Sequence, residues 1–184
     1  MAKVIGGITI SLDGFVNDRN GDVGVLYPEF EAIIASDLVQ DSIKTTGAVV
    51  MGRRAYEMGQ GDYSQYEYQV PIFVLTHHAP ETVAKGENEN LSFTFVSDDA
   101  ESAIAQAKAA AGDKEVMVIG GASTLQQCLK ADLLDELQIG IIPVLLGDGL
   151  PMFENIGTPR SRLEKVKVIE LPGGRTDIVF RVVK

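Results

Sequence analysis

The sequence contains one cysteine, Cys128, and no apolar run long enough to cross a membrane. A single cysteine cannot form an internal disulfide and cannot by itself hold a zinc ion, which favours a reducing compartment. The longest uncharged apolar stretch, residues 137–147, falls short of the ~20 residues of a membrane helix. Glycine and aspartate interrupt the apolar N-terminal segment, which therefore predicts a strand rather than a signal peptide. We expect a cytoplasmic protein.

Basic residues are also few: 16 lysines and arginines stand against 26 acidic residues, which gives a net charge of −10. The chain lacks the basic footprint of a nucleic-acid-binding protein, so we expect no nucleic-acid partner. Any polyanionic ligand must then be bound by local donors. With 184 residues, 45% of them hydrophobic, and no linker-like segment, the chain predicts one domain spanning residues 1–184.

Short β-rich segments alternate with helical patterns along most of the chain. Strands are predicted over residues 3–11, 48–51, 71–76, 91–96, 115–119 and 136–142. Helices are predicted over 28–44, from residue 53, from a cap at 97–99 to residue 111, and over 123–130. Two alternating segments, 163–170 and 176–183, flank a Pro-Gly-Gly turn and predict an antiparallel hairpin. This order predicts an α/β fold with a mixed sheet.

The first candidate site is the segment Gly52-Arg53-Arg54, which directly follows an apolar strand. Backbone N–H groups at a helix start favour an anion, and the arginines add charged donors worth about 1.5–3 kcal/mol per hydrogen bond. The segment therefore predicts a phosphate-binding site. A solvated basic turn is an equally good interpretation of this feature alone.

A second strand ends at Gly120 and Gly121, and the small residues Ala122, Ser123 and Thr124 lead into a helix. Glycine lets a ligand approach the backbone closely, and free amide groups can cradle a phosphate. An ordinary tight turn between strand and helix is the alternative. The segment is not the GxGxxG fingerprint, and the chain has no GxxxxGK[ST] phosphate loop.

A third polar segment, Thr76-His77-His78, follows the strand predicted over 71–76. In a mainly parallel α/β sheet, ligands bind beyond the carboxyl ends of the strands, so these residues can meet a phosphate or an adenine. Adjacent histidines in a strand point to opposite sides, so we expect no shared metal ion. For His78, the start of a polar loop is the alternative interpretation.

A carboxylate on an apolar helix face is a candidate acid. In a helix over 28–44, Asp37 and Asp41 fall on one stripe together with the apolar residues Phe30, Ile33, Ile34 and Leu38. Burial on that stripe raises a carboxyl pKa toward the range of a general acid, so Asp37 is a candidate proton donor. If the helix is rotated, both carboxylates are solvated or serve as caps.

Four short stretches, in this order, resemble the dihydrofolate reductase-like superfamily. They are residues 10–15 (ISLDGF), 51–57 (MGRRAYE), 119–122 (IGGA) and 143–149 (PVLLGDG). The sequence looks closest to stand-alone relatives of the reductase domain in the bifunctional riboflavin-biosynthesis deaminase–reductase. The resemblance implies a three-layer fold with an eight-stranded mixed sheet, helices on both faces, and NADPH as hydride donor. It also implies a homodimer.

The resemblance assigns roles to the matching residues. The cofactor phosphates are expected at Gly52, Arg53, Arg54, Thr76 and His77, with Arg54 or His77 near the 2′-phosphate. The pyrophosphate is expected along Gly120, Gly121, Ala122, Ser123 and Thr124, and the nicotinamide near Ile8 and Thr9, with Val16 closing over it. Asp37 is the first candidate for supplying a proton, and Asp13 is the second. An aspartate before glycine, as at Asp13, is also a common turn pair.

The leading hypothesis is an NADPH-dependent reductase acting on a pyrimidine-ribosyl or related heterocyclic small molecule, such as 5-amino-6-(5-phosphoribosylamino)uracil. The alternatives are a dihydrofolate or pterin reductase, a non-catalytic NADP-binding module, and a purely structural protein. The chain has no tryptophan, which a folate site usually includes, and no H-x-E with P-C-x-x-C, so deaminase activity is excluded. The reductase hypotheses require Arg53 and Gly121 to face one common groove.

Overall fold

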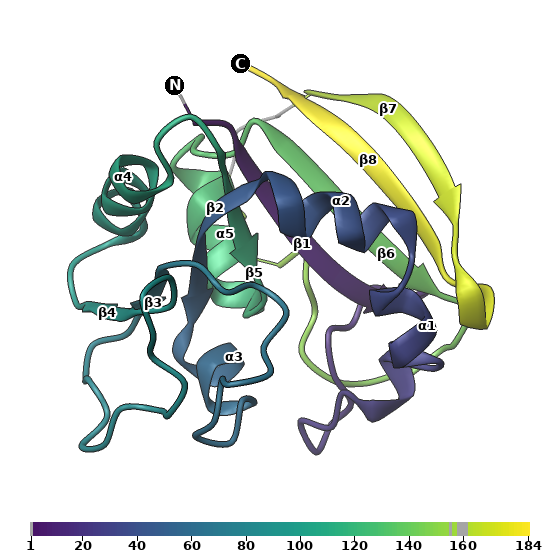
Figure 1. Cartoon of the computed structure of the whole chain (residues 1–184). Coiled ribbons are helices and arrows are strands. Elements are labelled where there is room, and N and C mark those ends of the chain that lie inside the picture. The colour runs from purple at the N-terminus through teal and green to yellow at the C-terminus, as the bar shows by residue number, and fades with distance from the viewer. Residues whose placement is uncertain (1, 155, 158–161) are drawn as a thin grey trace.

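The computed structural model describes residues 2–154, 156–157 and 162–184 (Figure 1). Its centre is an eight-stranded sheet in the order β4-β3-β2-β5-β1-β6-β8-β7. The strands are β1 Val4–Ser11, β2 Thr46–Gly52, β3 Ile72–Leu75, β4 Phe93–Val96, β5 Glu115–Ile119, β6 Glu136–Ile142, β7 Arg162–Glu170 and β8 Thr176–Val183. Strands β1 to β6 run parallel, and β8 pairs antiparallel with β6 and β7. The mixed sheet and the terminal hairpin are therefore confirmed.

Three helices begin close to the predicted positions: α3 Arg53–Glu57, α4 Ala100–Ala111 and α5 Ala122–Lys130. The start of α4 is fixed by Asp99, whose carboxylate accepts the backbone N–H of Ser102 at 2.8 Å. Such a cap satisfies one of the free N–H groups of the first turn. Gly112 follows the last residue of α4 with a φ of 62°, a conformation that glycine adopts without strain.

The single helix predicted over 28–44 is wrong, because the segment forms two helices, α1 Phe30–Ile34 and α2 Asp37–Thr45. Ser36 separates them in an extended conformation. Its hydroxyl donates to the carbonyl of Ile33 at 2.6 Å and accepts the backbone N–H of Val39 at 3.5 Å. Serine forms such local bonds in competition with a continuous helix, so it ends one helix and caps the next.

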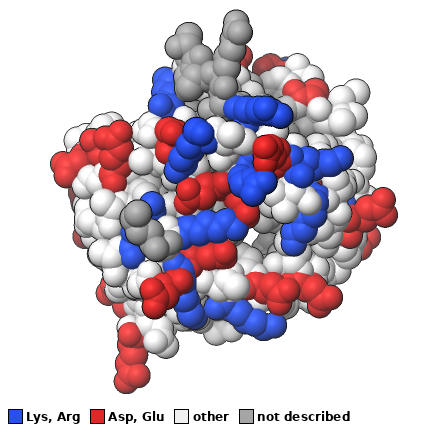
Figure 2. Space-filling view, turned by 90° about the horizontal axis from the view of Figure 1, so that it is seen from above, with Lys and Arg blue, Asp and Glu red and all other residues white. Residues whose placement is uncertain are grey.

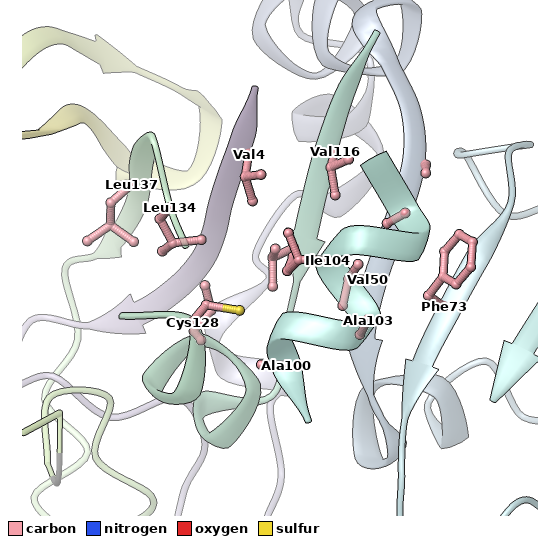
Figure 3. Packing of buried hydrophobic residues seen from close by; sticks show 14 of the residues in the cluster. Val4, Val50, Phe73, Ala100, Ala103, Ile104, Val116, Cys128, Leu134 and Leu137 are labelled. Atoms are coloured by element: carbon pink, nitrogen blue, oxygen red, sulfur yellow. The ribbon is translucent and has the colours of Figure 1, made fainter. Parts of the chain in front are cut away.

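Helices cover both faces of the sheet, as expected. On one face, α4 and α5 pack on the strands through a core that includes Val50 and Cys128 (Figure 3). Gly6 in β1 allows α5 to come close, since a Cβ there would lie 2.7 Å from the side chain of Leu125. On the other face, α2 contributes Ile43 to a second cluster that is rich in aromatic residues and includes Tyr56 of α3. These two layers hold the carboxyl ends of the parallel strands in place.

Charges of both signs alternate on the end of the molecule that carries the two termini (Figure 2). Ion pairs there join Lys3 to Glu136 at 2.5 Å and Lys184 to Asp135 at 3.0 Å. This face therefore presents no continuous basic field to a polyanion. Among the described residues, no helix combines the length and the apolar character that a membrane span requires.

Candidate active site

A cleft of about 480 Å³ opens where β2 and β3 end, beside the first turn of α5. Gly52, Arg53 and Arg54 line it on the side of β2, and Gly121 lines it where β5 leads into α5. The other lining residues are Leu75, Thr76, His77, His78, Ser97, Asp98, Ala122, Ser123, Thr124, Gln127 and Leu150. We call this cavity the polar cleft. The common groove expected for Arg53 and Gly121 is present.

Close backbone packing at the floor of the polar cleft explains its glycines. A Cβ on Gly52 would lie 2.6 Å from the hydroxyl oxygen of Thr124, which is buried. A Cβ on Gly121 would lie 3.5 Å from the same oxygen, and the φ of Gly121 is 75°. The end of β2 and the first turn of α5 therefore touch directly. Glycine at both positions also means that neither residue covers its own backbone with a side chain.

The two arginines supply the positive charge of the polar cleft. Both side chains are exposed, and Nε of Arg53 donates to the carboxylate of Glu57 at 2.7 Å, one turn along α3. Because α3 has only five residues, its dipole contributes little. The sequence-based expectation that a helix start binds the anion therefore applies less to α3 than to α5, which has nine residues. At β2, the guanidinium groups are the principal donors.

The third wall of the polar cleft follows β3. Thr76 is buried, and its hydroxyl donates to the carbonyl of His78 at 2.9 Å, so this side chain shapes the turn that exposes His77 and His78. Sequence reasoning missed Ser97 and Asp98, which it treated only as part of a helix cap. These two residues follow β4, the neighbour of β3. The rule that ligands bind beyond strand ends, applied to β4 as well, would have found them.

A second cavity, of about 170 Å³, adjoins the polar cleft. Gly120 lines this cavity and Gly121 lines the polar cleft, so the two meet at one peptide unit. Most of its lining is apolar, and we call it the apolar pocket. The lining residues are Gly7, Ile8, Thr9, Tyr27, Phe30, Ile33, Ile34, Leu38, Val39, Ser42, Glu67, Tyr68, Met117, Ile119, Gly120, Gln138 and Arg175.

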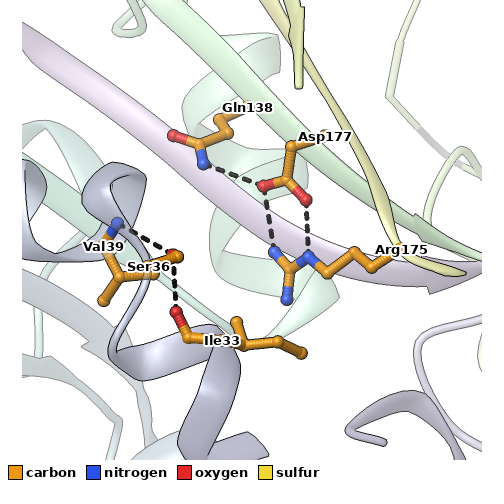
Figure 4. Close-up of polar contacts among 6 residues, drawn as sticks. All are labelled: Ile33, Ser36, Val39, Gln138, Arg175 and Asp177. Atoms are coloured by element: carbon orange, nitrogen blue, oxygen red, sulfur yellow. Dashed lines mark hydrogen bonds and ion pairs between the residues drawn. The ribbon is translucent and has the colours of Figure 1, made fainter. Parts of the chain in front are cut away.

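An ion pair stands at the wall of the apolar pocket (Figure 4). Arg175 donates from Nε and Nη2 to the two carboxylate oxygens of Asp177, at 2.5 and 3.0 Å. The amide of Gln138 donates to the same carboxylate at 2.9 Å. The side chain of Asp177 is fully buried, and that of Arg175 is 11% exposed. Sequence reasoning named none of these three residues as site residues, because they come from β6, β8 and the turn before β8.

Glu67 is the carboxylate among the described lining residues of the apolar pocket, and it too was missed by sequence reasoning. Burial raises its pKa above the ordinary value of a glutamate, since a carboxylate loses hydration there. It lies in the chain between α3 and β3, where the sequence shows no periodic pattern. The only sequence signal for a buried position was the pair of tyrosines, Tyr66 and Tyr68, that flank Glu67. The structure shows that Tyr68 is indeed buried.

The structure places the two candidate acids outside both cavities. Asp37 is exposed in the first turn of α2, so the expectation that it lies on a buried helix face is wrong; the break at Ser36 turns it to solvent. Asp13 accepts hydrogen bonds from the hydroxyl of Ser11 at 2.6 Å and from the backbone N–H of Gly147 at 2.7 Å. These bonds, that of Ser11 foremost, lower the pKa of Asp13. Its contacts are those of a residue that joins two loops.

The residues expected around the nicotinamide divide between two places. Ile8 and Thr9 of β1 line the apolar pocket. Val16 lies in neither lining; it is half-buried, and its backbone N–H donates to the carbonyl of Leu150 at 2.9 Å. Leu150 itself lines the polar cleft, so Val16 is joined to that wall through the backbone.

The chain was compared with protein families and with solved structures. Residues 2–175 match a family model described as the RibD C-terminal domain. A putative riboflavin biosynthesis protein from Shewanella sp. PV-4 is 26% identical, with a TM-score of 0.80 and complete coverage of both chains.

Two more distant structures share the fold. A deaminase and 5-amino-6-(5-phosphoribosylamino)uracil reductase from Thermotoga maritima is 16% identical, with a TM-score of 0.74 over 99% of this chain and 57% of that one. A dihydrofolate reductase from Enterococcus faecalis, complexed with NADP(H), is 17% identical, with a TM-score of 0.66 over 99% of this chain and 97% of that one. The dihydrofolate reductase-like fold is thereby confirmed.

Proposed function

The chain belongs to the RibD C-terminal domain family, and we propose that it is an NADPH-dependent reductase acting on a pyrimidine-ribosyl or related heterocyclic substrate. The observation that carries this proposal is the pair of adjoining cavities. The larger one is lined mostly by polar residues, including two arginines, and the smaller one is lined mostly by apolar residues. The structural relative from Thermotoga maritima, a deaminase and 5-amino-6-(5-phosphoribosylamino)uracil reductase, supports the reaction type.

The polar cleft fits a phosphorylated dinucleotide. Arg53, Arg54 and His77 offer donors on one side, and the first turn of α5, with Ser123 exposed, offers free backbone N–H groups on the other. Glycine at position 52 allows the end of β2 to pack against Thr124 of α5, which brings both sets of donors to one cleft. When bound, NADPH supplies the hydride, while the protein orients the reactants and excludes water. We place its phosphates in the polar cleft and its nicotinamide toward Ile8, Thr9 and Gly120.

The proton that accompanies hydride transfer was assigned from the sequence to Asp37 or Asp13. Both assignments stay predictions, and the geometry supports neither, because both side chains lie outside the apolar pocket. Glu67 is the carboxylate that lines this pocket, and the burial that raises its pKa keeps a proton on it over a wider pH range. Glu67 is therefore the better candidate for the proton donor.

The cofactor assignment is tested by titrating NADPH against protein fluorescence. In the double variant Arg53→Ala/Arg54→Ala we expect affinity to fall by about 10-fold or more, the effect of losing one or two charge-assisted hydrogen bonds. The matched control is Arg19→Ala/Arg181→Ala, which removes the same charge from exposed positions outside the cleft. Equal affinity in the wild type and the first variant would refute the assignment of the phosphates to this cleft.

A dihydrofolate or pterin reductase is the second candidate, favoured by the mostly apolar pocket, which suits a flat ring. Oxidation of NADPH with dihydrofolate but not with 5-amino-6-(5-phosphoribosylamino)uracil would select it. Binding of NADPH without oxidation in the presence of either compound would instead identify a non-catalytic module. We also propose a cytoplasmic homodimer. The edge strand β7 exposes Val166 and Val168, which a second copy can cover, and light scattering tests the dimer.

A further inference from the structure

The guanidinium group of Arg175 lies against β6 in space that is free because Gly140 has no side chain. A Cβ on Gly140 of β6 would lie 2.6 Å from both Cζ and Nε of Arg175. Any other residue at position 140 would displace the guanidinium group. The backbone carbonyl of Arg175 accepts the N–H of Leu171 at 2.8 Å, which closes the turn before β8. The backbone at Gly140 therefore limits where the guanidinium group can lie, and the hydrogen bond with Leu171 fixes the backbone of Arg175.

The ion pair with Asp177 uses only part of the donor capacity of Arg175. Nε and Nη2 bind the carboxylate, whereas Nη1 has no hydrogen-bond partner among the described residues. Figure 4 shows this third nitrogen pointing away from Asp177, on the side of Ile33. Ile33 and Arg175 both line the apolar pocket. Because Arg175 lines this cavity and Nη1 keeps its N–H groups free of protein acceptors among the described residues, Nη1 can donate to an acceptor on a ligand in the pocket.

The charges around the pocket determine which acceptor fits. Arg175 is the one cation among the described lining residues, and the buried carboxylate of Asp177 already neutralises it. Glu67, the carboxylate among the described lining residues, adds no positive charge in either protonation state. A phosphate would therefore enter without a compensating charge, at a high desolvation cost. A neutral acceptor, such as a ring carbonyl, needs no compensating charge.

We propose that Nη1 of Arg175 binds a ring carbonyl of a neutral, flat heterocycle in the apolar pocket, and that any phosphate of the substrate lies outside this pocket. The inference rests on the proposed function in one respect: the ring would then lie beside the nicotinamide. It adds a specificity-determining residue, Arg175, and a positioning residue, Gly140. The substrate class becomes a pyrimidinone or pterin-type ring, selected by its carbonyl and not by a phosphate.

Two probes separate the ring from the phosphate: 5,6-diaminouracil carries ring carbonyls without phosphate, and ribose 5-phosphate carries the phosphate without the ring. Both are titrated calorimetrically into the full chain, with and without NADP⁺. We expect diaminouracil to bind the wild type and to bind about 10- to 100-fold more weakly to Arg175→Lys, which keeps the cation beside Asp177 but loses the planar fork. Ribose 5-phosphate should show no binding that depends on Arg175.

Gly140→Ala is the second variant, since it moves the guanidinium group without changing its charge, and it should weaken diaminouracil binding by a similar factor. The matched control for Arg175→Lys is Arg181→Lys, in β8 and paired with Glu164 at the surface. Unchanged NADPH affinity shows that both variants are folded.

Three outcomes overturn the inference: no diaminouracil binding to the wild type, equal binding in both variants, or ribose 5-phosphate binding that Arg175→Lys abolishes. Failure of the proposed function gives a different pattern. In that case the wild type does not bind NADPH, whereas the response of diaminouracil to Arg175→Lys is still measurable without cofactor.

Discussion

The polar cleft and the apolar pocket share a peptide unit but are built in opposite ways. The polar cleft consists of short contiguous segments at strand ends, with exposed side chains such as Arg53 and His77. The apolar pocket combines residues from six separate parts of the chain, among them Arg175, whose partner Asp177 has no contact with solvent. A charged ligand can bind in the cleft because its charge stays hydrated and screened by solvent. In the pocket, a buried charge is stable only when an opposite charge of the protein pairs with it, as Asp177 pairs with Arg175.

The largest effect that separates the two cavities should come from Asp177→Ala. It leaves the 11%-exposed guanidinium of Arg175 without its partner, which costs about 3–5 kcal/mol in buried pairs. Urea denaturation measures the loss of unfolding free energy. Glu164→Ala is the control, because it breaks the exposed pair with Arg181 at 2.6 Å, and such pairs contribute about 0–1 kcal/mol. Similar losses in both variants would show that the pair at Asp177 is not a desolvated one.

A smaller effect is expected in the polar cleft from Gly52→Ala. The new methyl group would lie 2.6 Å from the hydroxyl oxygen of the buried Thr124, and such overpacking costs about 1–3 kcal/mol. Removing that oxygen as well, in Gly52→Ala/Thr124→Ala, should restore part of the lost stability. The measurement is again urea denaturation.

Gly24→Ala is the control for this substitution, since the nearest atom to its added Cβ is a surface carboxylate oxygen of Asp22 at 3.3 Å. If the double variant is no more stable than Gly52→Ala alone, the contact between β2 and α5 is not what requires glycine at position 52.

The contrast between the cavities explains how much could be predicted. Alternating and apolar segments indicated the strands, and glycine or arginine at a strand end indicated the polar cleft, because these signals lie within a few residues of one another. The break at Ser36 was missed because the apolar spacing of 28–44 continues across it, and the break is marked only by the local hydrogen bonds of the Ser36 hydroxyl with Ile33 and Val39. That error placed Asp37 on the wrong face.

The apolar pocket could not be predicted in the same way, since its members are up to 168 positions apart, from Gly7 to Arg175. One local signal was available: Asp177 interrupts the apolar residues at the start of the last strand, and a carboxylate on a sheet face needs a partner. The sequence does not show which cation pairs with it. The pairing partner depends on the strand register. Asp177 lies opposite Gly140 on β6, and the missing side chain of Gly140 leaves space for Arg175.

The smallest expected effect is a pH dependence of the stability that arises from Glu67 in the apolar pocket. Burial raises the folded-state pKa of Glu67 above its ordinary value of 4.5, so ionised Glu67 reduces stability at neutral pH. This penalty decreases as the pH falls through the folded-state pKa, and it is absent below pH 4.5, where the carboxyl group is mostly protonated in both states. Glu67→Gln should therefore be more stable than the wild type at pH 7 and equal to it below pH 4.5.

The control is Asp98→Asn, which replaces an exposed carboxylate of the polar cleft by an amide. This variant should not be more stable than the wild type at pH 7. Melting temperatures of the three proteins between pH 4 and 8 make the comparison. A gain in Asp98→Asn equal to that in Glu67→Gln would reflect the net charge of −10 of the whole chain and not desolvation in the pocket. A gain limited to Glu67→Gln would locate the penalty in the apolar pocket, which is where a neutral substrate ring is expected to bind.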